Sequence, residues 1–339
     1  MKKLRSNSKG NLVSNDHDHD HDHDHDQVMK VHHEGIKTIG VQSTCCDFSG
    51  NNSDLCLCIV TWNMNGHVTY EDVEKIVGKN RGYDLLVVGL QEAVSKYNVI
   101  TMFESVLSAS HFLLGESTLQ SLQLYVFGPK NSQMFVKELK RDKYATGGWG
   151  GMINRKKGAV AIRINYKAFR LEFISCHLSA HAKNVEERNS QLRDIRRALF
   201  AKDWNPYGRT SQVTIWLGDL NYRLEGINTF PARSLIHSDL HQMLTENDQL
   251  LQEAERGEIF NGYFEGTLAF KPTYKFDIGS STYDTSHKVR VPSWTDRILF
   301  KIEDNNKIVA SLHSYDSIDT VRSSDHKPVK AHLCLKERK

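Results

Sequence analysis

Short apolar runs, each about as long as a β-strand, recur along the chain from about residue 54 onward. Many of them are rich in β-branched residues, which favour strands. The runs cover residues 55–62, 85–90, 122–127, 159–164, 169–176, 213–217, 298–302 and 329–335. Because segments with helical spacing lie between some of these runs, the pattern predicts a layered α/β domain.

Two segments have the spacing of an amphipathic helix. The first contains Leu192, Ile195 and Leu199. The second follows the candidate N-cap residues Ser238 and Asp239 and contains Leu240, Met243, Leu244 and Leu251. We therefore expect a helix in each segment.

The amino-terminal part of the chain has a different composition. Asp and His alternate over residues 16–26, which leaves no apolar side to bury, so this tract is expected to stay hydrated. Its histidines could chelate transition metals, but a solvated spacer is the simpler interpretation. Since no Gly/Ser-rich linker divides the remainder, we predict a disordered tail over residues 1–50 and one catalytic domain over residues 51–339.

Charge and apolar content exclude several classes of protein. The chain has 44 Lys and Arg against 41 Asp and Glu, which is far below the basicity of a dedicated nucleic-acid binder. No apolar run approaches the ~20 residues of a membrane-spanning helix, and no apolar stretch follows the basic start. We therefore expect neither an integral membrane protein nor a secreted one.

The six cysteines show neither a zinc-ligand spacing nor a disulfide framework. They are Cys45, Cys46, Cys56, Cys58, Cys176 and Cys334. This arrangement predicts reduced, mostly buried thiols in a cytoplasmic or nuclear protein.

Polar residues stand at the ends of six of the apolar runs. Those that follow a run are Asn63, Asn65, Glu92, His177, Asp219 and Asn221, and those that precede one are Asp296, Asp325 and His326. Each group alone has an ordinary structural explanation, such as a turn, a helix cap or a surface ion pair. Side chains at one end of neighbouring strands can converge on one cleft, so the six groups together indicate a single active site.

The side chains of this predicted site are carboxylates, carboxamides and imidazoles, with no Ser or Cys nucleophile beside a base. Oxygen ligands such as Glu92 and Asn65 suit Mg²⁺, whereas zinc would favour thiolates or several imidazoles. Phosphoryl transfer to water needs charge neutralisation at the phosphate, a base and stabilisation of the leaving oxygen. We therefore predict Mg²⁺-assisted hydrolysis of a phosphoester by direct attack of water.

Several motifs resemble those of the Mg²⁺-dependent inositol polyphosphate 5-phosphatases, within the superfamily of phosphoesterases that includes DNase I and exonuclease III. The resemblance spans about residues 55–335. It rests on TWNMNG (61–66), GLQE (89–92), KKGAVAIRI (156–164), CHLSAH (176–181), WLGDLNYRL (216–224), FKPTYKFD (270–277), RVPSWTDRILF (290–300) and SSDHKPV (323–329). Short members of the family that look similar are plant-type enzymes. The resemblance implies a four-layer α/β/β/α sandwich of two mixed sheets.

The resemblance also implies roles for the polar residues. Glu92 would be the main Mg²⁺ ligand, and the residues supporting it would be Asn65, Asn63 and Asp325. Asp219 would orient and deprotonate the attacking water, and Asn221 would hold the phosphate or the nucleophile. His326 would bond the scissile phosphate with its tautomer set by Asp296, while His177 would line the phosphate pocket.

Substrate phosphates that are not cleaved need cationic or phenolic partners. The candidates are Lys157, Tyr274, Lys275, Arg290 and Arg188. Arg188 has an equally good interpretation as a solvated surface charge. The resemblance implies that Tyr274 and Lys275 would recognise a 4-phosphate.

These features lead us to expect a monomeric phosphoinositide 5-phosphatase that binds the cytosolic face of membranes peripherally. Its substrates would be phosphatidylinositol 4,5-bisphosphate and the 3,4,5-trisphosphate. Three alternatives stay open: a soluble inositol polyphosphate 5-phosphatase acting on inositol 1,4,5-trisphosphate, a nuclease on the same scaffold, and a catalytically silent phosphoinositide-binding module.

Overall fold

The computed structural model describes residues 35–42, 53–79, 82–146, 157–203, 211–303 and 306–338. The Asp/His tract and most of the predicted tail lie outside the described residues. None of the described helices is long and apolar enough to span a membrane.

The first β-sheet contains seven strands in the order β1, β10, β11, β9, β8, β7, β6. Their bounds are β1 Lys37–Ile39, β10 Phe264–Gly266, β11 Asp296–Ile302, β9 Val213–Asp219, β8 Phe169–His177, β7 Gly158–Tyr166 and β6 Val136–Ala145. β8 and β9 are parallel, and β11 is antiparallel to β9. The carboxyl ends of β8 and β9 therefore lie beside the amino end of β11.

The second sheet contains six strands in the order β12, β13, β2, β3, β5, β4. Their bounds are β12 Ile308–Ser317, β13 Val329–Glu337, β2 Asp54–Asn63, β3 Leu85–Gln91, β5 Leu122–Pro129 and β4 His111–Leu119. β2 and β3 are parallel, while β13 is antiparallel to β2. In this sheet too, the carboxyl ends of two strands, β2 and β3, lie beside the amino end of a third, β13.

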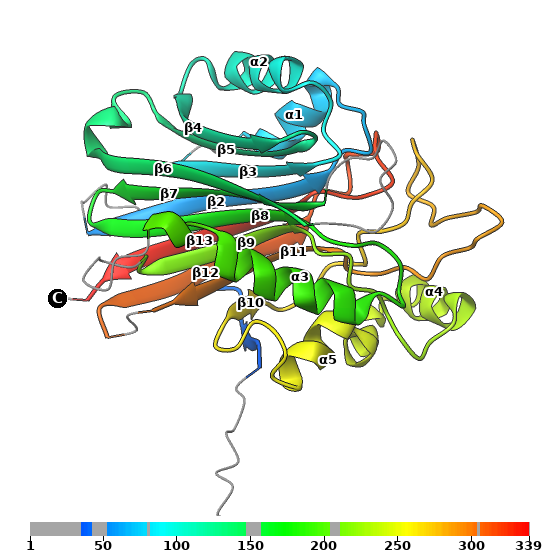
Figure 1. Cartoon of the computed structure of the whole chain (residues 1–339). Coiled ribbons are helices and arrows are strands. Elements are labelled where there is room, and N and C mark those ends of the chain that lie inside the picture. Colours follow the sequence, from blue (N-terminus) through cyan, green and yellow to red (C-terminus); the bar gives the residue numbers. More distant parts are fainter. Residues whose placement is uncertain are drawn as a thin grey trace, which may run out of the picture. The chain divides into compact units, whose positions relative to one another are not determined.

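Most of the helices lie on the outer faces of the two sheets (Figure 1). The α-helices are α1 Tyr70–Val77, α2 Lys96–Leu107, α3 Val185–Ala198, α4 Thr229–His237 and α5 Gln249–Glu255. Three 3₁₀ segments are η1 Ser132–Phe135, η2 Ala201–Asp203 and η3 His241–Asn247. In Figure 1, α1 and α2 lie on one side of the paired sheets and α3 lies on the other.

Three apolar clusters hold the layers together. The largest lies between the sheets and includes Leu57 of β2 and Leu217 of β9. A second joins the outer face of β2 to α1 and α2, and a third joins the outer face of β9 to α3 and α5. Because successive side chains of a strand point to opposite faces, β2 and β9 each contribute to two clusters. The predicted four-layer α/β/β/α sandwich is confirmed.

All eight predicted strands are present to within one or two residues of their predicted ends, but five further strands were missed. The missed strands are β1, β4, β6, β10 and β12. β6 shows why, because charged residues fill its exposed positions and leave no apolar run to recognise. β1 and β10 are only three residues long.

Two sequence-based boundaries need correction. The second predicted helix is instead the 3₁₀ segment η3 followed by α5, because Asp248 adopts an extended backbone and its side chain caps α5 by accepting from the Leu251 amide. In addition, β1 pairs in parallel with β10, so residues 37–39 belong to the first sheet although we predicted a disordered tail up to residue 50.

The prediction for the cysteines was wrong at one pair. Cys56 of β2 and Cys334 of β13 form a disulfide, whereas Cys58 and Cys176 are buried thiols. The two bonded residues are separated by 278 positions in the chain, yet the β2–β13 register places them directly opposite each other. Only that register brings them together, so their spacing in the sequence carries no sign of the pairing.

Arg297 is the fully buried centre of an ion-pair network, although the sequence allowed a surface ion pair between Asp296 and Arg297. Its guanidinium donates to Glu265 at 2.6 and 2.7 Å and to Asp248 at 2.9 Å. All three side chains are at most 3% exposed. The network joins β11 to β10 and to the start of α5, next to the strand end that carries Asp296.

We expect Arg297→Ala to lower the free energy of unfolding by about 3–5 kcal/mol, because two buried carboxylates lose their only guanidinium partner in the network. Urea unfolding followed by circular dichroism measures the loss. Arg193→Ala is the matched control, since Arg193 pairs with Glu258 at the surface at 3.0 Å and should cost less than about 1 kcal/mol. Equal losses in the two variants would contradict a stabilising role for the buried network.

Candidate active site

Three acidic or imidazole side chains stand in one row at the ends of neighbouring strands of the first sheet. The register pairs His177 of β8 with Asp219 of β9, and Asp219 with Asp296 of β11. Gly218 allows this close packing: it has φ of +146°, and a Cβ there would lie 2.1 Å from the carbonyl oxygen of Cys176. The glycine before Asp219 is thus required by the approach of β8.

Asp219 has partners on both of its carboxylate oxygens and is 1% exposed. Its Oδ2 accepts from the Asn63 amide at 3.0 Å and lies 3.3 Å from His177 Nε2. Its Oδ1 accepts from the backbone N–H of Asn221 at 3.1 Å. Burial alone would raise the pKa of Asp219, but His177, His326 and Lys157 lower it well below its usual range. Asp219 is therefore an ionised carboxylate that is held by residues of both sheets, Asn63 of β2 and His177 of β8.

His177 contacts both the carboxylate of Asp219 and the ammonium group of Lys157 through Nε2. Burial and the positive charge of Lys157 lower the pKa of His177, and the charges of Asp219 and Glu92 only partly oppose them. His177, predicted to line the phosphate pocket, and Lys157, predicted to contact an uncleaved phosphate, therefore come together beside Asp219.

His326 and Asp296 form a second buried pair, in which His326 Nδ1 lies 2.9 Å from Asp296 Oδ2. Two hydroxyl groups, those of Thr273 and Thr295, also donate to Asp296 Oδ2 at 2.8 Å. Burial opposes charge on the imidazole, but Asp296 and the nearby carboxylates of Asp219 and Asp325 outweigh it and raise the pKa of His326 to about 9. Because Nδ1 faces Asp296, the second ring nitrogen is left to face a ligand.

Three of the four predicted metal ligands, Asn63, Asn65 and Glu92, lie at the end of β2 or in the turns after β2 and β3. Asn65 and Glu92 both have a positive φ, 47° and 49°, and the Gly66 amide donates to the Glu92 carbonyl at 2.9 Å. Asn63 accepts from the Asn65 backbone amide through Oδ1 at 3.0 Å. With its other side-chain atom bonded to Asp219, Asn63 acts as a bridge between the sheets more than as a free oxygen ligand.

The donor atoms fit a divalent cation. Ligand atoms of Asp219, Asp296 and His326 all lie within 4.8 Å of one another. Asp296 Oδ1 is buried and has no hydrogen-bond partner among the described residues. Glu92, half-buried at the edge of this group, adds a carboxylate whose charge reaches His177. A carboxylate-rich cluster of this kind suits a cation that prefers oxygen ligands.

A cleft of about 200 Å³ adjoins these groups. Its lining includes His181, Arg223, Tyr274 and Arg290. The Tyr274 ring lies 4.4 Å from the ring of His326, which connects the cleft to the buried pair. Beside Tyr274, Lys275 Nζ donates to Asp325 Oδ2 at 2.6 Å. The cleft is thus lined by the cations Arg223 and Arg290, and Tyr274 connects it to His326.

Arg188 was wrongly predicted as a substrate contact and is not a surface charge either. It is 0% exposed, and its guanidinium donates to the carbonyl oxygens of Ser179, His181 and Ala182 and to the Gln249 side chain. Burial lowers the pKa of Arg188 to about 10. Its role is to hold the loop at residues 179–182, three residues of which line the cleft.

Sequence reasoning did not single out Arg223, Thr273 or Thr295. Arg223 bonds the side-chain oxygen of Asn221 and stacks over Tyr274 with its guanidinium carbon 4.3 Å from the ring centre. The signal for these residues was present, since Arg223 belongs to the WLGDLNYRL motif and the two threonines lie in FKPTYKFD and RVPSWTDRILF. What the motifs lacked was the information on which members face the cleft.

Comparisons with known proteins give one consistent result. The family model described as Endonuclease/Exonuclease/phosphatase family 2 matches residues 60–332. The chain is similar to the Arabidopsis thaliana protein named type IV inositol polyphosphate 5-phosphatase 11, with 61% identity over 90% of this chain and 89% of that protein. It is also 32% identical to human phosphatidylinositol 4,5-bisphosphate 5-phosphatase A, over 82% of this chain and 30% of that longer protein.

A solved structure shares both the fold and part of the sequence. It is the inositol polyphosphate 5-phosphatase domain of SpSynaptojanin, in complex with inositol (1,4)-bisphosphate and a calcium ion. The TM-score is 0.71 and the identity is 29%, over 84% of this chain and 86% of that one.

We expect Arg188→Lys to destabilise the protein by about 2–3 kcal/mol, because a lysine keeps the charge but lacks the planar fork that reaches several carbonyl oxygens. Urea unfolding measures the change. Arg193→Lys, made on the exposed side of the same helix, should be nearly neutral. A neutral Arg188→Lys would show that the loop at residues 179–182 does not depend on the guanidinium.

Proposed function

Because the chain belongs to the inositol polyphosphate 5-phosphatase family and is therefore a phosphate monoester hydrolase, we propose that its substrate is phosphatidylinositol 4,5-bisphosphate. The enzyme removes the 5-phosphate by direct attack of water, with Mg²⁺ as the cofactor. The 3,4,5-trisphosphate is a second substrate. The observation that carries the proposal is the group formed by Asp219, Asp296 and His326, whose ring lies 4.4 Å from Tyr274 of a cleft that Arg223 and Arg290 also line.

Asp219 orients the attacking water in this proposal. The Asn63 amide and His177 fix the direction of its carboxylate, and burial removes competing solvent. A carboxylate held in this way accepts a hydrogen bond from water and takes its proton as the new P–O bond forms. Asn221, bonded through its amide to the Leu178 carbonyl at 3.0 Å, lies next to this position and holds the phosphate.

His326 binds the scissile phosphate. Its Nδ1 faces Asp296, so Nε2–H is the group that can donate to a phosphate oxygen. Thr273 and Thr295 keep Asp296 in place, which makes the imidazole a rigid donor at the moment when charge develops on the phosphate.

In this proposal Glu92, Asn65 and Asp325 would hold the Mg²⁺ ion, while Asp219 acts on the water and the His326–Asp296 pair acts on the phosphate. When bound, the ion neutralises negative charge on the phosphate oxygens and on the leaving oxygen. Lys157, in contact with His177, adds a positive charge on the other side of the same pocket. Direct attack leaves no phosphoenzyme, in line with the lack of a positioned Ser or Cys nucleophile in the motifs.

The 4-phosphate is recognised by Tyr274 and Lys275. Lys275 Nζ lies 2.6 Å from Asp325 Oδ2, and its side chain is 24% exposed, so it can exchange part of this contact for a phosphate oxygen. Arg290 and Arg223 at the cleft wall add cationic groups for the same phosphate-rich ring.

Exposed apolar residues near the cleft-lining segments in the sequence or fold support a lipid substrate. Phe230 at the start of α4 is 78% exposed and Ile278 is 57% exposed. The Thr229 hydroxyl donates to the Val289 carbonyl at 2.7 Å, which ties the start of α4 to the segment that carries Arg290. Apolar side chains next to cations suit a peripheral contact with an anionic membrane.

A phosphate-release assay tests the proposed function. The substrates are phosphatidylinositol 4,5-bisphosphate in vesicles and soluble inositol 1,4,5-trisphosphate, each with Mg²⁺ and with a chelator. We expect turnover of the lipid that depends on Mg²⁺, and Asp219→Asn should lower kcat by about 10²–10⁴-fold because orientation and proton transfer are lost. Asp239→Asn is the control, since Asp239 pairs with Lys271 at the surface.

The assay can contradict the proposal in two ways. An Asp219→Asn enzyme with unchanged turnover would remove the proposed role of the carboxylate. Turnover of inositol 1,4,5-trisphosphate without turnover of the lipid would favour the soluble inositol phosphate as substrate.

Recognition of the 4-phosphate gives a separate prediction. Lys275→Ala should lower kcat/KM for phosphatidylinositol 4,5-bisphosphate by about 10–100-fold, because the variant loses a hydrogen bond to a charged group that contributes about 1.5–3 kcal/mol. For phosphatidylinositol 3,5-bisphosphate, which has no 4-phosphate, the change should be small. Lys271→Ala is the matched control. Equal losses with both lipids would show that Lys275 acts through Asp325 and not through the 4-phosphate.

A further inference from the structure

A group of sulfur and imidazole side chains lies on the outer face of the second sheet, where β2, β13 and β12 adjoin. Cys56 and Cys334 are directly opposite each other on β2 and β13, with Cα atoms 4.3 Å apart. Their neighbours in the strands, Leu55, Leu57, Leu333 and Leu335, belong to the core between the sheets. Since side chains alternate along a strand, the two sulfur atoms are on the face turned away from that core.

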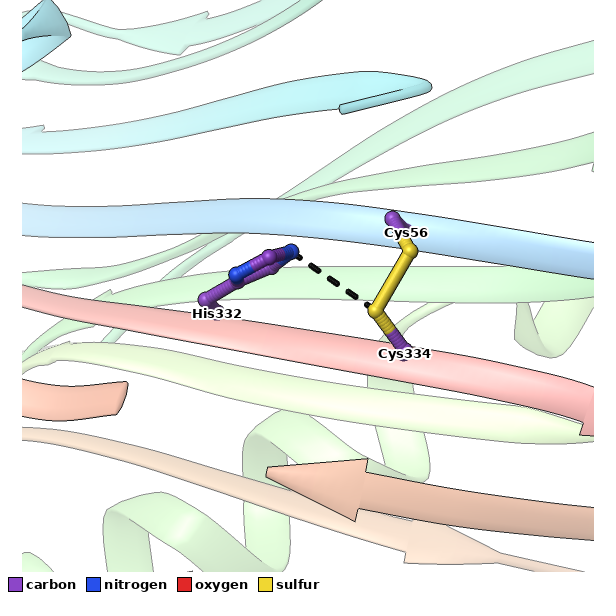
Figure 2. A group of neighbouring side chains, drawn as sticks. All are labelled: Cys56, His332 and Cys334. Carbon is purple, nitrogen blue, oxygen red and sulfur yellow. Dashed lines mark hydrogen bonds between the residues drawn. A yellow bond between two sulfur atoms is a disulfide. The ribbon is translucent and has the colours of Figure 1, made fainter. Parts of the chain in front are cut away.

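His332 is on the same face, two residues before Cys334. Figure 2 shows its imidazole directed toward the sulfur atoms, with Nε2 lying 3.6 Å from Cys334 Sγ. Ligand atoms of Cys56, His332 and Cys334 all lie within 4.8 Å of one another. The group therefore has the dimensions of one metal-ion site.

A second imidazole stands beside the first. His313 occupies the irregular position between Leu312 and Ser314, where the β12–β13 register shifts. Its ring lies 5.3 Å from the ring of His332, measured between centroids.

We propose that Cys56, Cys334, His332 and His313 bind one Zn²⁺ ion when the two cysteines are reduced. Two thiolates and two imidazoles make a tetrahedral set for zinc, whose bonds to sulfur and nitrogen are about 2.3 and 2.0–2.1 Å long. The same set discriminates against Mg²⁺, which requires oxygen ligands. The spacing of the cysteines gave no zinc pattern because the ligands come from three strands.

Zinc binding and the disulfide exclude each other. Two molecules of a small thiol reduce the disulfide: they transfer two electrons and two protons, leave as their own disulfide, and the protein gains two thiols. Zn²⁺ then displaces the two thiol protons and binds both thiolates together with two neutral imidazoles. The site therefore exists only under reducing conditions.

The group is accessible to an ion from the surface of the sheet. His332, Cys334 and His313 are half-buried, whereas Cys56 is 2% exposed. An ion can thus enter from the side of β13 and β12 without unfolding of the sheet.

The zinc site is far from the predicted reaction centre. Cys56 lies seven residues before Asn63 on β2, which at about 3.3 Å per residue corresponds to about 23 Å. The ion would join the last strand of the chain to the first strand of its sheet. We therefore expect zinc to stabilise the fold and to leave turnover unchanged.

Cobalt substitution tests the proposal by detecting a metal–thiolate bond. The Asp/His tract can stay in the chain, because it offers imidazole and carboxylate ligands but no sulfur. The full chain is reduced with a phosphine, stripped of metal with a chelator and titrated with Co²⁺. We expect one equivalent to give the near-ultraviolet charge-transfer band of a Co²⁺–thiolate bond, together with the intense visible bands of a tetrahedral site. Zn²⁺ should then displace Co²⁺ and abolish both.

Variants separate this site from other thiols and from the tract. The Cys56→Ser/Cys334→Ser double variant should lose the thiolate band completely. His332→Gln and His313→Gln should each weaken Zn²⁺ affinity at least about tenfold. Cys176→Ala, which removes a buried thiol from the other sheet, should keep both the band and the affinity. Unreduced protein should show no band until the phosphine is added.

Three results would overturn the proposal. One is the absence of a thiolate band in reduced wild-type protein that is folded by circular dichroism. Another is a band of equal intensity in the double variant. The third is a thermal midpoint that Zn²⁺ changes neither in the reduced wild-type protein nor in the double variant. Phosphatase turnover in Mg²⁺ serves as the control for folding and should match wild type in the double variant.

Discussion

The hydrogen bond from Asn63 to Asp219 joins the carboxyl ends of two strands that belong to different sheets. β2 and β9 are packed face to face through an apolar core, and this single polar contact fixes how their ends meet. Three other candidate groups are positioned relative to Asp219: His177 and Asp296 by strand register, and His326 through its pair with Asp296. A small shift of one sheet over the other would separate the groups.

Burying so many charged groups is costly unless each has a partner. The structure meets this requirement with networks of two kinds. Arg297 and Arg188 are fully buried and hold, respectively, the strand that begins with Asp296 and the loop beside the cleft. Asp219 and His326 are buried as well, but they are paired in a way that leaves part of the surrounding cluster open to a cation. The networks around Arg297 and Arg188 therefore support the pairs formed by Asp219 and His326.

The two ends of β2 and β13 have different chemistry. One end carries carboxylates and amides that suit a cation with a preference for oxygen, and the other carries the sulfur and imidazole groups of Cys56, Cys334 and His332. Hard and soft ligands select different metals. An antiparallel pair of strands can keep two such groups apart because its length, and not a flexible loop, sets their separation.

The amino-acid sequence by itself determined the layered α/β class, eight of the strands and the polar residues at their ends, because apolar periodicity and local motifs are encoded within a few neighbouring residues. It did not determine that Arg188 is buried, that His313 stands at a bulge, or that Cys56 faces Cys334. Those outcomes depend on register and packing between segments far apart in the chain. Only the tertiary structure decided them, since burial and distance are properties of the assembled sheets.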